Sequence, residues 1–337
     1  MTDTNNTHDD AARDPRADGT AAASSSENGN TAGAAAPGTT ATGGSPAAAI
    51  AEEQAAGGTP AWAADFEALR VSERPDRLHV ALDRPDVRNA IDQVMVDELH
   101  TVCGHLEREP KIMVLSGTRV NGKGIFASGA DIAQLRERRR EDALRGVNSQ
   151  IFDRIAKLPM PVVAALDGYA LGGGAELAWA ADFRIGTPRL KVGQPETGLG
   201  IMPAAGGTQR LAKLVGLGRA TEIVLTGRRV KAEDALAMGL VTQVVEPDEL
   251  LDTARETAQA IMAKGPLAIQ LAKTVIRHGF DVDHQTGILL ERLAQSVLYS
   301  SAEKAEGTTA FLEKRTPDFR TAAQQDAPQN AQKDVSK

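Results

Sequence analysis

Two glutamates stand twenty residues apart, each inside a glycine-rich segment: Glu176 in GYALGGGAEL and Glu196 in VGQPETGLGIMPAAGG. The glycines at 172–174 come just before an apolar helical pattern, and the first N–H groups of a helix have no acceptor within it. Glycines let a ligand approach those groups closely, and the helix dipole adds partial positive charge there. The two segments together predict a site for a developing oxyanion beside a pair of carboxylates that handle protons.

Each segment also has a purely structural interpretation. A run of glycines between a strand and a helix often forms only a tight turn, and an acid in a first helical turn, as Glu176 would be, is common without catalysis. A dinucleotide fingerprint fits less well, because Leu177 stands where G-x-G-x-x-G needs its third glycine. The neighbours of Glu176 are apolar, which indicates a buried carboxyl with a raised pKa and favours a role in proton transfer. Glu196 is either a plain loop acid or its partner.

The hydrophobic pattern predicts an α/β core. Short β-branched runs at 77–83, 111–117 and 160–168 alternate with helical patterns such as 91–107. Shorter strands are predicted at 182–188, 189–195 and 241–247. Strands that alternate with helices favour largely parallel pairing.

Composition divides the chain into four regions. Residues 1–62 are rich in Ala, Gly, Ser and Thr, and residues 1–60 carry eight acidic side chains against two arginines, which accounts for most of the net charge of −7. Such a segment has little to bury, so it is predicted to be a disordered acidic tail. The α/β core is predicted at 63–250, a helical region without strands at 251–320, and a second disordered tail at 321–337.

Several classes of protein are disfavoured. The acidic start lacks a signal peptide's basic and apolar parts, and no apolar run reaches the length of a membrane span. With Cys103 as the only cysteine, a reducing cytoplasm is expected. His100, Cys103 and His105 share one predicted helix, but their spacing does not put them on one face, so no metal site is predicted.

Two further segments are open to alternative interpretations. In GIFASGADI, small residues between a strand and a helix either supply a second backbone donor at Ala130 or simply begin a helix. The basic run at 136–145 is most simply a solvated helix face, and an anion contact is the alternative.

Taken together, the motifs resemble those of the crotonase superfamily, the enoyl-CoA hydratases and isomerases. The likeness covers residues 69–320, and its specificity comes from the order and spacing of its segments. The segments are RPDVRNAID, IFASGADI, MPVVAALDGYALGGGAELAWAADFRIG, GQPETGLGIMPAAGGTQRL, LTGRRVKAEDALAMGLV and TTAFLEKR.

The resemblance implies a spiral of ββα units, followed by C-terminal helices that pack in a homotrimer or a dimer of trimers. It implies an acyl-CoA thioester as substrate, with no separate cofactor because coenzyme A is part of the substrate, and a place in fatty acid β-oxidation. The family's oxyanion hole maps onto the N–H groups of Ala130 and Gly173. Members with glutamates at both positions are typically hydratases, with Glu176 as the base that activates water and Glu196 as the acid. Residues expected to bind the thioester's coenzyme A are Arg88, Asn89, Ala90, Ala127, Ser128, Gly129, Asp131, Ile132, Gly172 and Lys314.

Two departures from the family pattern put the substrate preference in question. Ala133 stands where many hydratases have a lysine, so one phosphate contact is either missing or supplied by Arg136. Ala204 replaces the first glycine of PGAGG, and it keeps the N–H if its backbone angles suit a residue with a Cβ. An isomerase or a specialised 3-hydroxyacyl-CoA dehydratase on the same fold is the alternative. RNA binding, known for some relatives, is disfavoured by the near-neutral body and the acidic tail.

Overall fold

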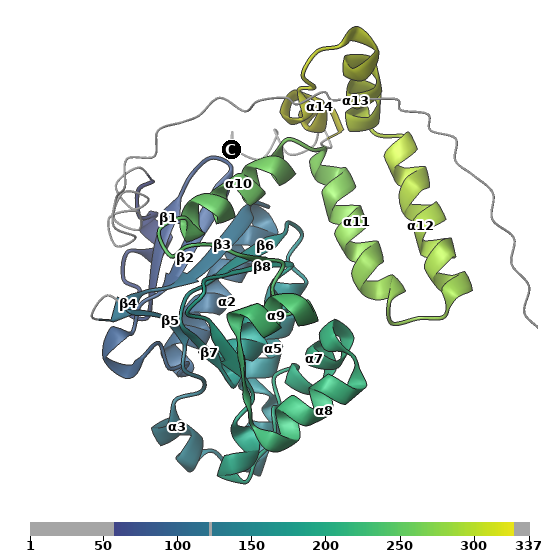
Figure 1. Cartoon of the computed structure of the whole chain (residues 1–337). Coiled ribbons are helices and arrows are strands. Elements are labelled where there is room, and N and C mark those ends of the chain that lie inside the picture. Colours follow the sequence, from purple (N-terminus) through teal and green to yellow (C-terminus); the bar gives the residue numbers. More distant parts are fainter. Residues whose placement is uncertain (1–56, 121–122, 327–337) are drawn as a thin grey trace, which may run out of the picture. The chain divides into compact units, whose positions relative to one another are not determined.

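The strands form two sheets in the computed structural model, which describes residues 57–120 and 123–326 (Figure 1). The larger sheet has six strands in the order β1-β2-β3-β6-β8-β11. Its strands are β1 (Leu69–Glu73), β2 (Arg77–Leu82), β3 (Ile112–Gly117), β6 (Val162–Leu166), β8 (Phe183–Gly186) and β11 (Gln243–Val244). Every pair is parallel except β1 with β2. All residues of β2 and β6 are buried, as expected for parallel strands covered on both faces.

The smaller sheet has five strands in the order β10-β9-β7-β5-β4. Its strands are β4 (Arg119–Val120), β5 (Lys123–Ala127), β7 (Tyr169–Leu171), β9 (Lys191–Gly193) and β10 (Arg229–Lys231). The inner pairs are parallel, and the two edge pairs are antiparallel. The strand predicted at 160–168 is β6, which ends at Leu166; the chain then turns at Gly168 (φ 71°) and continues as β7 in the other sheet. The sequence did not predict this second strand or the change of sheet.

Helices follow the strands as the apolar spacing predicts. The helix predicted at 91–107 is α2 (Gln93–Arg108), which begins where the Asp92 side chain accepts a hydrogen bond from the Met95 N–H (2.9 Å). The other helices of this part are α3 (Ile132–Glu137), α4 (Arg140–Arg145), α5 (Val147–Ala156), α6 (Gly173–Ala180), α7 (Gly207–Val215), α8 (Leu217–Thr226) and α9 (Ala232–Met238), with short 3₁₀ segments η2 (Pro85–Val87) and η3 (Glu196–Leu199). The predicted α/β class is confirmed.

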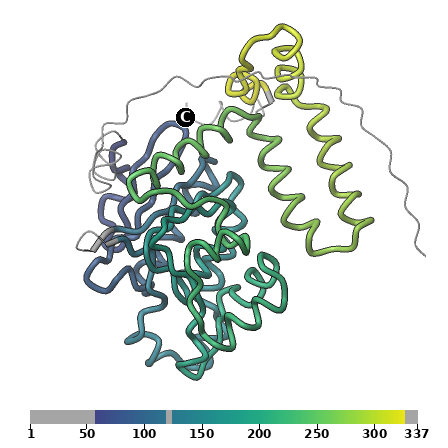
Figure 2. The backbone as a smooth tube through the Cα atoms, in the orientation of Figure 1, coloured from purple at the N-terminus to yellow at the C-terminus, as the bar shows by residue number. Residues whose placement is uncertain are grey.

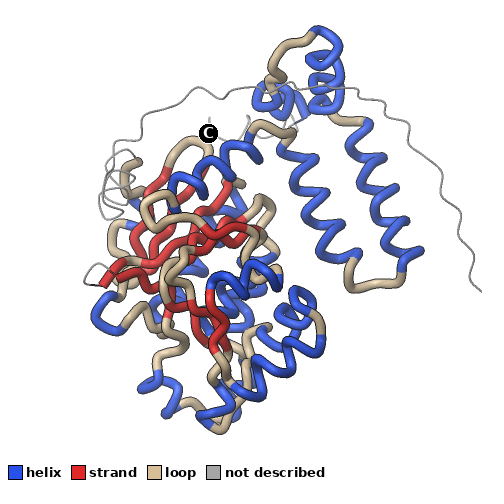
Figure 3. Tube along the Cα trace, viewed as in Figure 1, coloured by secondary structure: helices blue, strands red, loops and turns tan. Residues whose placement is uncertain are grey.

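The described residues after β11 form helices only, as predicted (Figure 3). They are α10 (Leu250–Met262), α11 (Pro266–Gly279), α12 (His284–Tyr299), α13 (Ala302–Glu313) and α14 (Phe319–Asp326). The backbone trace shows α11 and α12 running side by side in opposite directions (Figure 2). Neither α11 nor α12 contains a buried residue, whereas α10 buries four residues against β3, β6 and β8. No helix of the described part is both long and apolar enough to cross a membrane.

Each of the two segments predicted to be a disordered tail contains residues that the structure places in a helix. Trp62 was assigned to the disordered tail, but it lies in η1 (Ala61–Ala63) and stacks on His105 with ring centroids 4.5 Å apart. At the other end, α14 extends into the segment predicted to begin at residue 321. The predictions for residues 1–56 and 327–337 lie outside the described residues.

Candidate active site

The glycine-rich turn joins β7 to α6 and brings backbone N–H groups to the start of a buried helix. Gly172 is the residue before α6 and has φ 52° and ψ −125°, a conformation that favours glycine. Its N–H donates to the Gly193 carbonyl (2.9 Å), which fastens the turn to β9. Every residue of α6 is buried, and a Cβ at Gly174 would overlap the backbone of Ala127 on β5. The glycines therefore serve both the turn and the close packing of the helix on the sheet.

The amides of Ala130 and Gly173 lie next to each other. A Cβ placed on Gly173 would be 3.5 Å from the Ala130 nitrogen, and one on Gly129 would be 3.9 Å from the Gly173 nitrogen. Ala130 pairs with Ile91 in an isolated parallel bridge. The hydrogen bonds of this bridge join Ile91 to the residues on either side of Ala130: the Ile91 N–H donates to the Gly129 carbonyl, and the Asp131 N–H donates to the Ile91 carbonyl. The Ala130 N–H must then face the other side, as alternate residues of a strand do. Among the backbone hydrogen bonds of the described residues, neither of these two N–H groups is a donor.

Glu176 is held from a second loop. The residue is 3% exposed, and its Oε1 accepts hydrogen bonds from the N–H groups of Ala205 (2.7 Å) and Gly207 (2.8 Å). Burial raises the pKa of the Glu176 carboxyl, while these two N–H groups and the charge of Arg210 oppose the rise. Glu176 is thus a fixed carboxyl whose proton affinity is set by competing influences.

Glu196 approaches the same turn from η3. A Cβ on Gly172 would lie 3.0 Å from Glu196 Oε1, so this carboxyl lies against the residue that precedes α6. Burial, together with the nearby carboxylate of Glu176, raises the pKa of Glu196 to about 7. With its NH₂ turned toward Glu196, the buried Gln194 amide donates to Oε1 (2.7 Å) and Oε2 (2.8 Å). An amide can offer its NH₂ to an ionised carboxylate or its carbonyl to a protonated one.

The structure thus places the Ala130 and Gly173 amides and the Glu196 carboxyl at one glycine-rich turn, with the Glu176 carboxyl close enough to act on the pKa of Glu196. The family model for enoyl-CoA hydratase/isomerase matches residues 78–322. The chain belongs to the enoyl-CoA hydratase/isomerase family. The predicted resemblance and the crotonase-like α/β fold are therefore confirmed.

Individual members of the enoyl-CoA hydratase/isomerase family are similar over nearly their whole length. The short-chain-enoyl-CoA hydratase of Clostridium acetobutylicum is 39% identical over 240 residues, which cover 70% of this chain and 91% of that protein. The crotonyl-CoA hydratase of Syntrophomonas wolfei is 37% identical over 252 residues, covering 74% and 96%. The crystal structure of an enoyl-CoA hydratase from Bacillus anthracis has a TM-score of 0.72 and 36% identity, covering 75% of this chain and 99% of that one.

The segments that the family resemblance assigned to coenzyme A run side by side next to the two amides. The Ser128 N–H donates to the Arg88 carbonyl (3.1 Å), and the Ile91 N–H donates to the Gly129 carbonyl (2.8 Å). Arg88 is exposed and has a left-handed backbone (φ 58°). Ile132, at the start of α3, is 60% exposed. These positions lie at a surface beside the site and stay predictions as ligand contacts.

The side chain of Asn89, a residue expected to bind coenzyme A, forms its hydrogen bonds within the protein. It is completely buried, and its Nδ2 donates to the carbonyls of Ile125 (2.8 Å) and Phe126 (3.2 Å), while its Oδ1 accepts from the Arg84 N–H (2.8 Å). Its side chain therefore ties the 84–90 loop to β5 instead of facing a ligand. Asp131 likewise uses its carboxylate to cap α3, accepting from the N–H groups of Ala133 and Gln134.

The remaining predicted contacts differ in their settings. Ala90 and Ala127 are buried, so only their backbone could meet a ligand. Lys314 ends α13 with a left-handed backbone (φ 56°) and is exposed, and its phosphate contact stays a prediction. Arg136, the predicted substitute for the missing lysine at position 133, pairs with Glu137 (2.9 Å) on an exposed face of α3.

Sequence reasoning missed several residues that shape the site of this family member. Gln194 stands two residues before Glu196, and this closeness in sequence was the available signal. Arg210 follows the second glycine-rich loop in the polar run TQR, which gave no signal. Asn148 on α5 lies beside Gly173, with its Nδ2 3.7 Å from where a Cβ of that glycine would be. Its Oδ1 is buried without a hydrogen-bond partner among the described residues.

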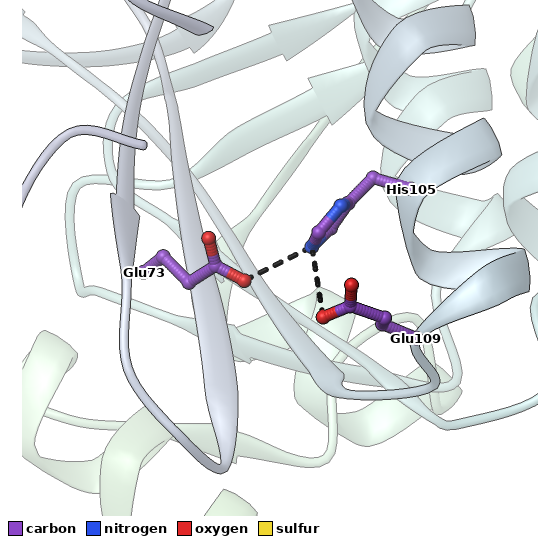
Figure 4. A group of neighbouring side chains, drawn as sticks. All are labelled: Glu73, His105 and Glu109. Atoms are coloured by element: carbon purple, nitrogen blue, oxygen red, sulfur yellow. Dashed lines mark hydrogen bonds and ion pairs between the residues drawn. The ribbon is translucent and has the colours of Figure 1, made fainter. Parts of the chain in front are cut away.

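A separate cluster has the ligand types of a metal site (Figure 4). His105 Nε2 lies 2.9 Å from Glu73 Oε1 and 4.0 Å from Glu109 Oε2. The ammonium of Lys111 lies 2.5 Å from the same Glu73 oxygen and 3.7 Å from Glu109. Because Lys111 already supplies a positive charge to both carboxylates, the geometry is that of an ion-pair network that fastens β1 to the end of α2. The histidine combination considered from the sequence, with His100 and Cys103, is not the one that the fold brings together.

Proposed function

We propose that this chain is an enoyl-CoA hydratase, which adds water reversibly across the 2,3 double bond of a 2-enoyl-CoA thioester. The observation that carries the proposal is the placement of the Ala130 and Gly173 amides beside two carboxyls with raised pKa values. The relatives named as hydratases support it. The proposed reaction needs no cofactor, because coenzyme A is part of the substrate.

The two amides act on the thioester carbonyl. As the hydroxyl adds at C3, electrons move from the double bond onto the carbonyl oxygen, and the N–H groups of Ala130 and Gly173 stabilise that charge more than the uncharged carbonyl. The α6 dipole favours negative charge at the same point. Each such donor contributes roughly 10²–10³ in rate.

The carboxyls move the protons. Ionised Glu176 takes a proton from water while the water oxygen bonds to C3, and protonated Glu196 delivers its proton to C2. The product carries one added water, Glu176 ends protonated and Glu196 ends ionised; proton exchange with solvent restores both. The pKa of Glu196 near 7 leaves a substantial fraction of it protonated at neutral pH, as an acid requires. Two neighbouring carboxyls that cannot both ionise freely divide these roles between them.

The substrate's coenzyme A part is proposed to bind along Arg88–Ala90 and 127–132, where exposed Arg88 offers a cation for phosphate. Exposed apolar side chains occur nearby along the chain, on 132–144 and 199–202, and would suit the acyl chain; they are Ile132, Leu144, Leu199, Ile201 and Met202. Lys314 is proposed to reach a phosphate within an oligomer.

An oligomer is proposed because α11 and α12 present apolar side chains to solvent in the single chain. These exposed residues are Ile276, Ile288, Leu289, Leu293 and Val297. Contiguous apolar surface of this kind usually marks an interface. A homotrimer or a dimer of trimers, a cytoplasmic location and a step in fatty acid β-oxidation complete the proposal. Sedimentation analysis of the purified chain tests the assembly: a single species at the mass of one chain would refute it.

The activity test uses crotonyl-CoA. The purified chain should remove the absorbance of the conjugated thioester, and the Glu176→Gln, Glu196→Gln double variant should not. Full activity in the double variant would refute the mechanism. A matched 3-enoyl thioester tests the isomerase alternative, and 3-hydroxybutyryl-CoA tests the reverse, dehydrating direction. A gel shift with RNA at physiological salt tests nucleic-acid binding, which the net charge of −7 disfavours.

A further inference from the structure

Arg210 is the one charged side chain that lies directly against the loop holding Glu176, as far as the described contacts show. It belongs to the first turns of α7, and its Nη1 donates to the Ala205 carbonyl (2.9 Å). The guanidinium also packs on Gly206, where a Cβ would overlap it. Ala205 and Gly207, the residues on either side of Gly206, supply the two N–H groups that hold Glu176.

The 205–207 loop also borders a cavity of about 780 Å³. Ala205, Gly206 and Arg210 line it, whereas Glu176 is not among its lining residues. The Arg210 side chain is only 18% exposed, and its Nη2 lies 3.5 Å from Asp153 on α5. Asp153 thus anchors the guanidinium from one side while Ala205 accepts its hydrogen bond on the other.

We propose that Arg210 is a positioning residue: it braces the 205–207 loop so that two N–H groups stay aimed at Glu176, and its charge favours the ionised carboxylate. The proposal rests on the proposed function, in which Glu176 is the base. The proposal gives Arg210 no contact with substrate or with the reacting water, so its effect passes through the loop and through the electrostatic field.

Several charged groups act on Glu176 and Arg210, and together they decide how the loss of Arg210 would change the ionisation of Glu176. Burial raises the pKa of Glu176, and Arg210 opposes the rise. Burial lowers the pKa of Arg210; Asp153 on α5 and Glu176 on α6 oppose that change, while Arg277 on α11 adds to it. Glu196 on η3 is the other carboxyl that interacts with Glu176. Without the guanidinium, Glu176 keeps its proton to higher pH and is ionised in a smaller fraction of molecules.

Arg210→Met tests the proposal, with Lys213→Met as the matched control. Lys213 is a cation on the same helix and lines the same cavity, but it pairs with Asp281 and makes no contact with the 205–207 loop in the described interactions. In Arg210→Met, kcat for crotonyl-CoA should fall roughly 10- to 100-fold, as for a small misplacement of a catalytic group. KM should change little, and the acid limb of the kcat profile should move to higher pH. The Lys213→Met control should keep the wild-type kcat and the wild-type acid limb.

Arg210→Lys separates charge from bracing. It should restore the acid limb but only part of kcat, because one ammonium cannot reproduce the planar fork of donors. It also keeps the test decisive if Arg210→Met does not fold, which circular dichroism would reveal. Unchanged kcat and acid limb in Arg210→Met, or equal losses in the Lys213 control, would overturn the proposal.

A second measurement does not depend on activity. Carbon-13 NMR of glutamate-labelled protein, with Glu176→Gln used to assign the signal, follows the titration of the Glu176 carboxyl. Arg210→Met should titrate at higher pH than the wild type. If the wild type fails to hydrate any thioester, the proposed function fails, and this titration alone decides whether Arg210 controls Glu176. An unmoved titration would refute that control.

Discussion

The two carboxyls of the site come from regions that hold them in different ways. Glu176 lies on α6, where every residue is buried, and one of its oxygens is fixed by two backbone N–H groups. Glu196 begins the short 3₁₀ segment η3, where it is half-buried, and its described side-chain partner is the Gln194 amide. One carboxyl is thus fixed by backbone and the other by a side chain.

The difference explains how two chemically identical groups can take opposite roles. Burial raises both pKa values, but for Glu176 two backbone hydrogen bonds and a nearby guanidinium oppose the rise. For Glu196 the neighbouring carboxylate adds to it, and the pKa reaches about 7. The surroundings therefore favour a base at Glu176 and an acid at Glu196, which environment alone can achieve.

Separate replacement of the two carboxyls gives the largest expected effects. Glu176→Gln should lower kcat by about 10⁴-fold, and Glu196→Gln by about 10²-fold or more, since general acid–base groups contribute in this range. Proton exchange at C2 of butyryl-CoA in D₂O distinguishes the roles. Glu176→Gln should keep the exchange, and Glu196→Gln should lose it. The opposite pattern would mean that the roles are reversed.

The pH dependence of the wild type should show the same division. Because Glu196 must be protonated to act as an acid, kcat should fall as pH rises above about 7, up to about tenfold for each pH unit. The acid limb should report ionisation of Glu176. The two pKa values belong to an interacting pair, so Glu196→Gln should shift the acid limb as well as remove the alkaline one. An alkaline limb that persists in Glu196→Gln would contradict the assignment.

The sequence predicted those features of the fold and of the site that depend on local pattern. The glycines at 172–174 were correctly placed at a helix start, and the apolar neighbours of Glu176 correctly indicated burial. Apolar runs also located β2, β3 and β6. Such features depend on spacing along a few residues, which the chain alone displays.

What the sequence did not predict depends on contacts between distant segments. The turn at Gly168 that takes the chain from one sheet to the other is decided by partners on β5 and β8, not by the run itself. The family resemblance assigned Asn89 to coenzyme A binding, and the sequence did not show that its side-chain amide donates to carbonyls of β5. Arg210 gave no signal of its own until the fold placed it against the loop that holds Glu176.

A smaller effect is expected on stability, and it should again separate the two carboxyls. The folded-state pKa of Glu196 is raised from 4.5 to about 7, so the folded protein binds more protons than the unfolded chain between these values. Stability contributed by this group is present below about pH 4.5 and is lost as pH rises toward 7. The Tm of Glu196→Gln minus the Tm of the wild type should therefore be larger at pH 8 than at pH 5. Allowing for solvent screening of a partly exposed group, the gain should be roughly 2–4 °C.

Calorimetry at the two pH values provides the measurement. Glu233→Gln is a suitable control, because this carboxylate is exposed on α9 and no histidine lies among its described contacts. The control should show no comparable pH-dependent gain. A Tm difference between Glu196→Gln and wild type that is the same at both pH values would mean that Glu196 has an ordinary pKa in the folded protein.

The smallest effect is expected at Ala204, where the family resemblance led us to expect a glycine. Among the described residues, the non-glycine positions with positive φ are Arg88, Asn89 and Lys314, so Ala204 has a backbone that accepts a Cβ without strain. The hydrogen bonds to Glu176 come from the N–H groups of Ala205 and Gly207, not from Ala204. Ala204→Gly should leave kcat nearly unchanged and cost about 0.5–1 kcal/mol of stability through the freedom gained by the unfolded chain. A rise in both kcat and Tm would instead show that alanine strains the loop, and Glu176 would then be less firmly fixed than its two hydrogen bonds indicate.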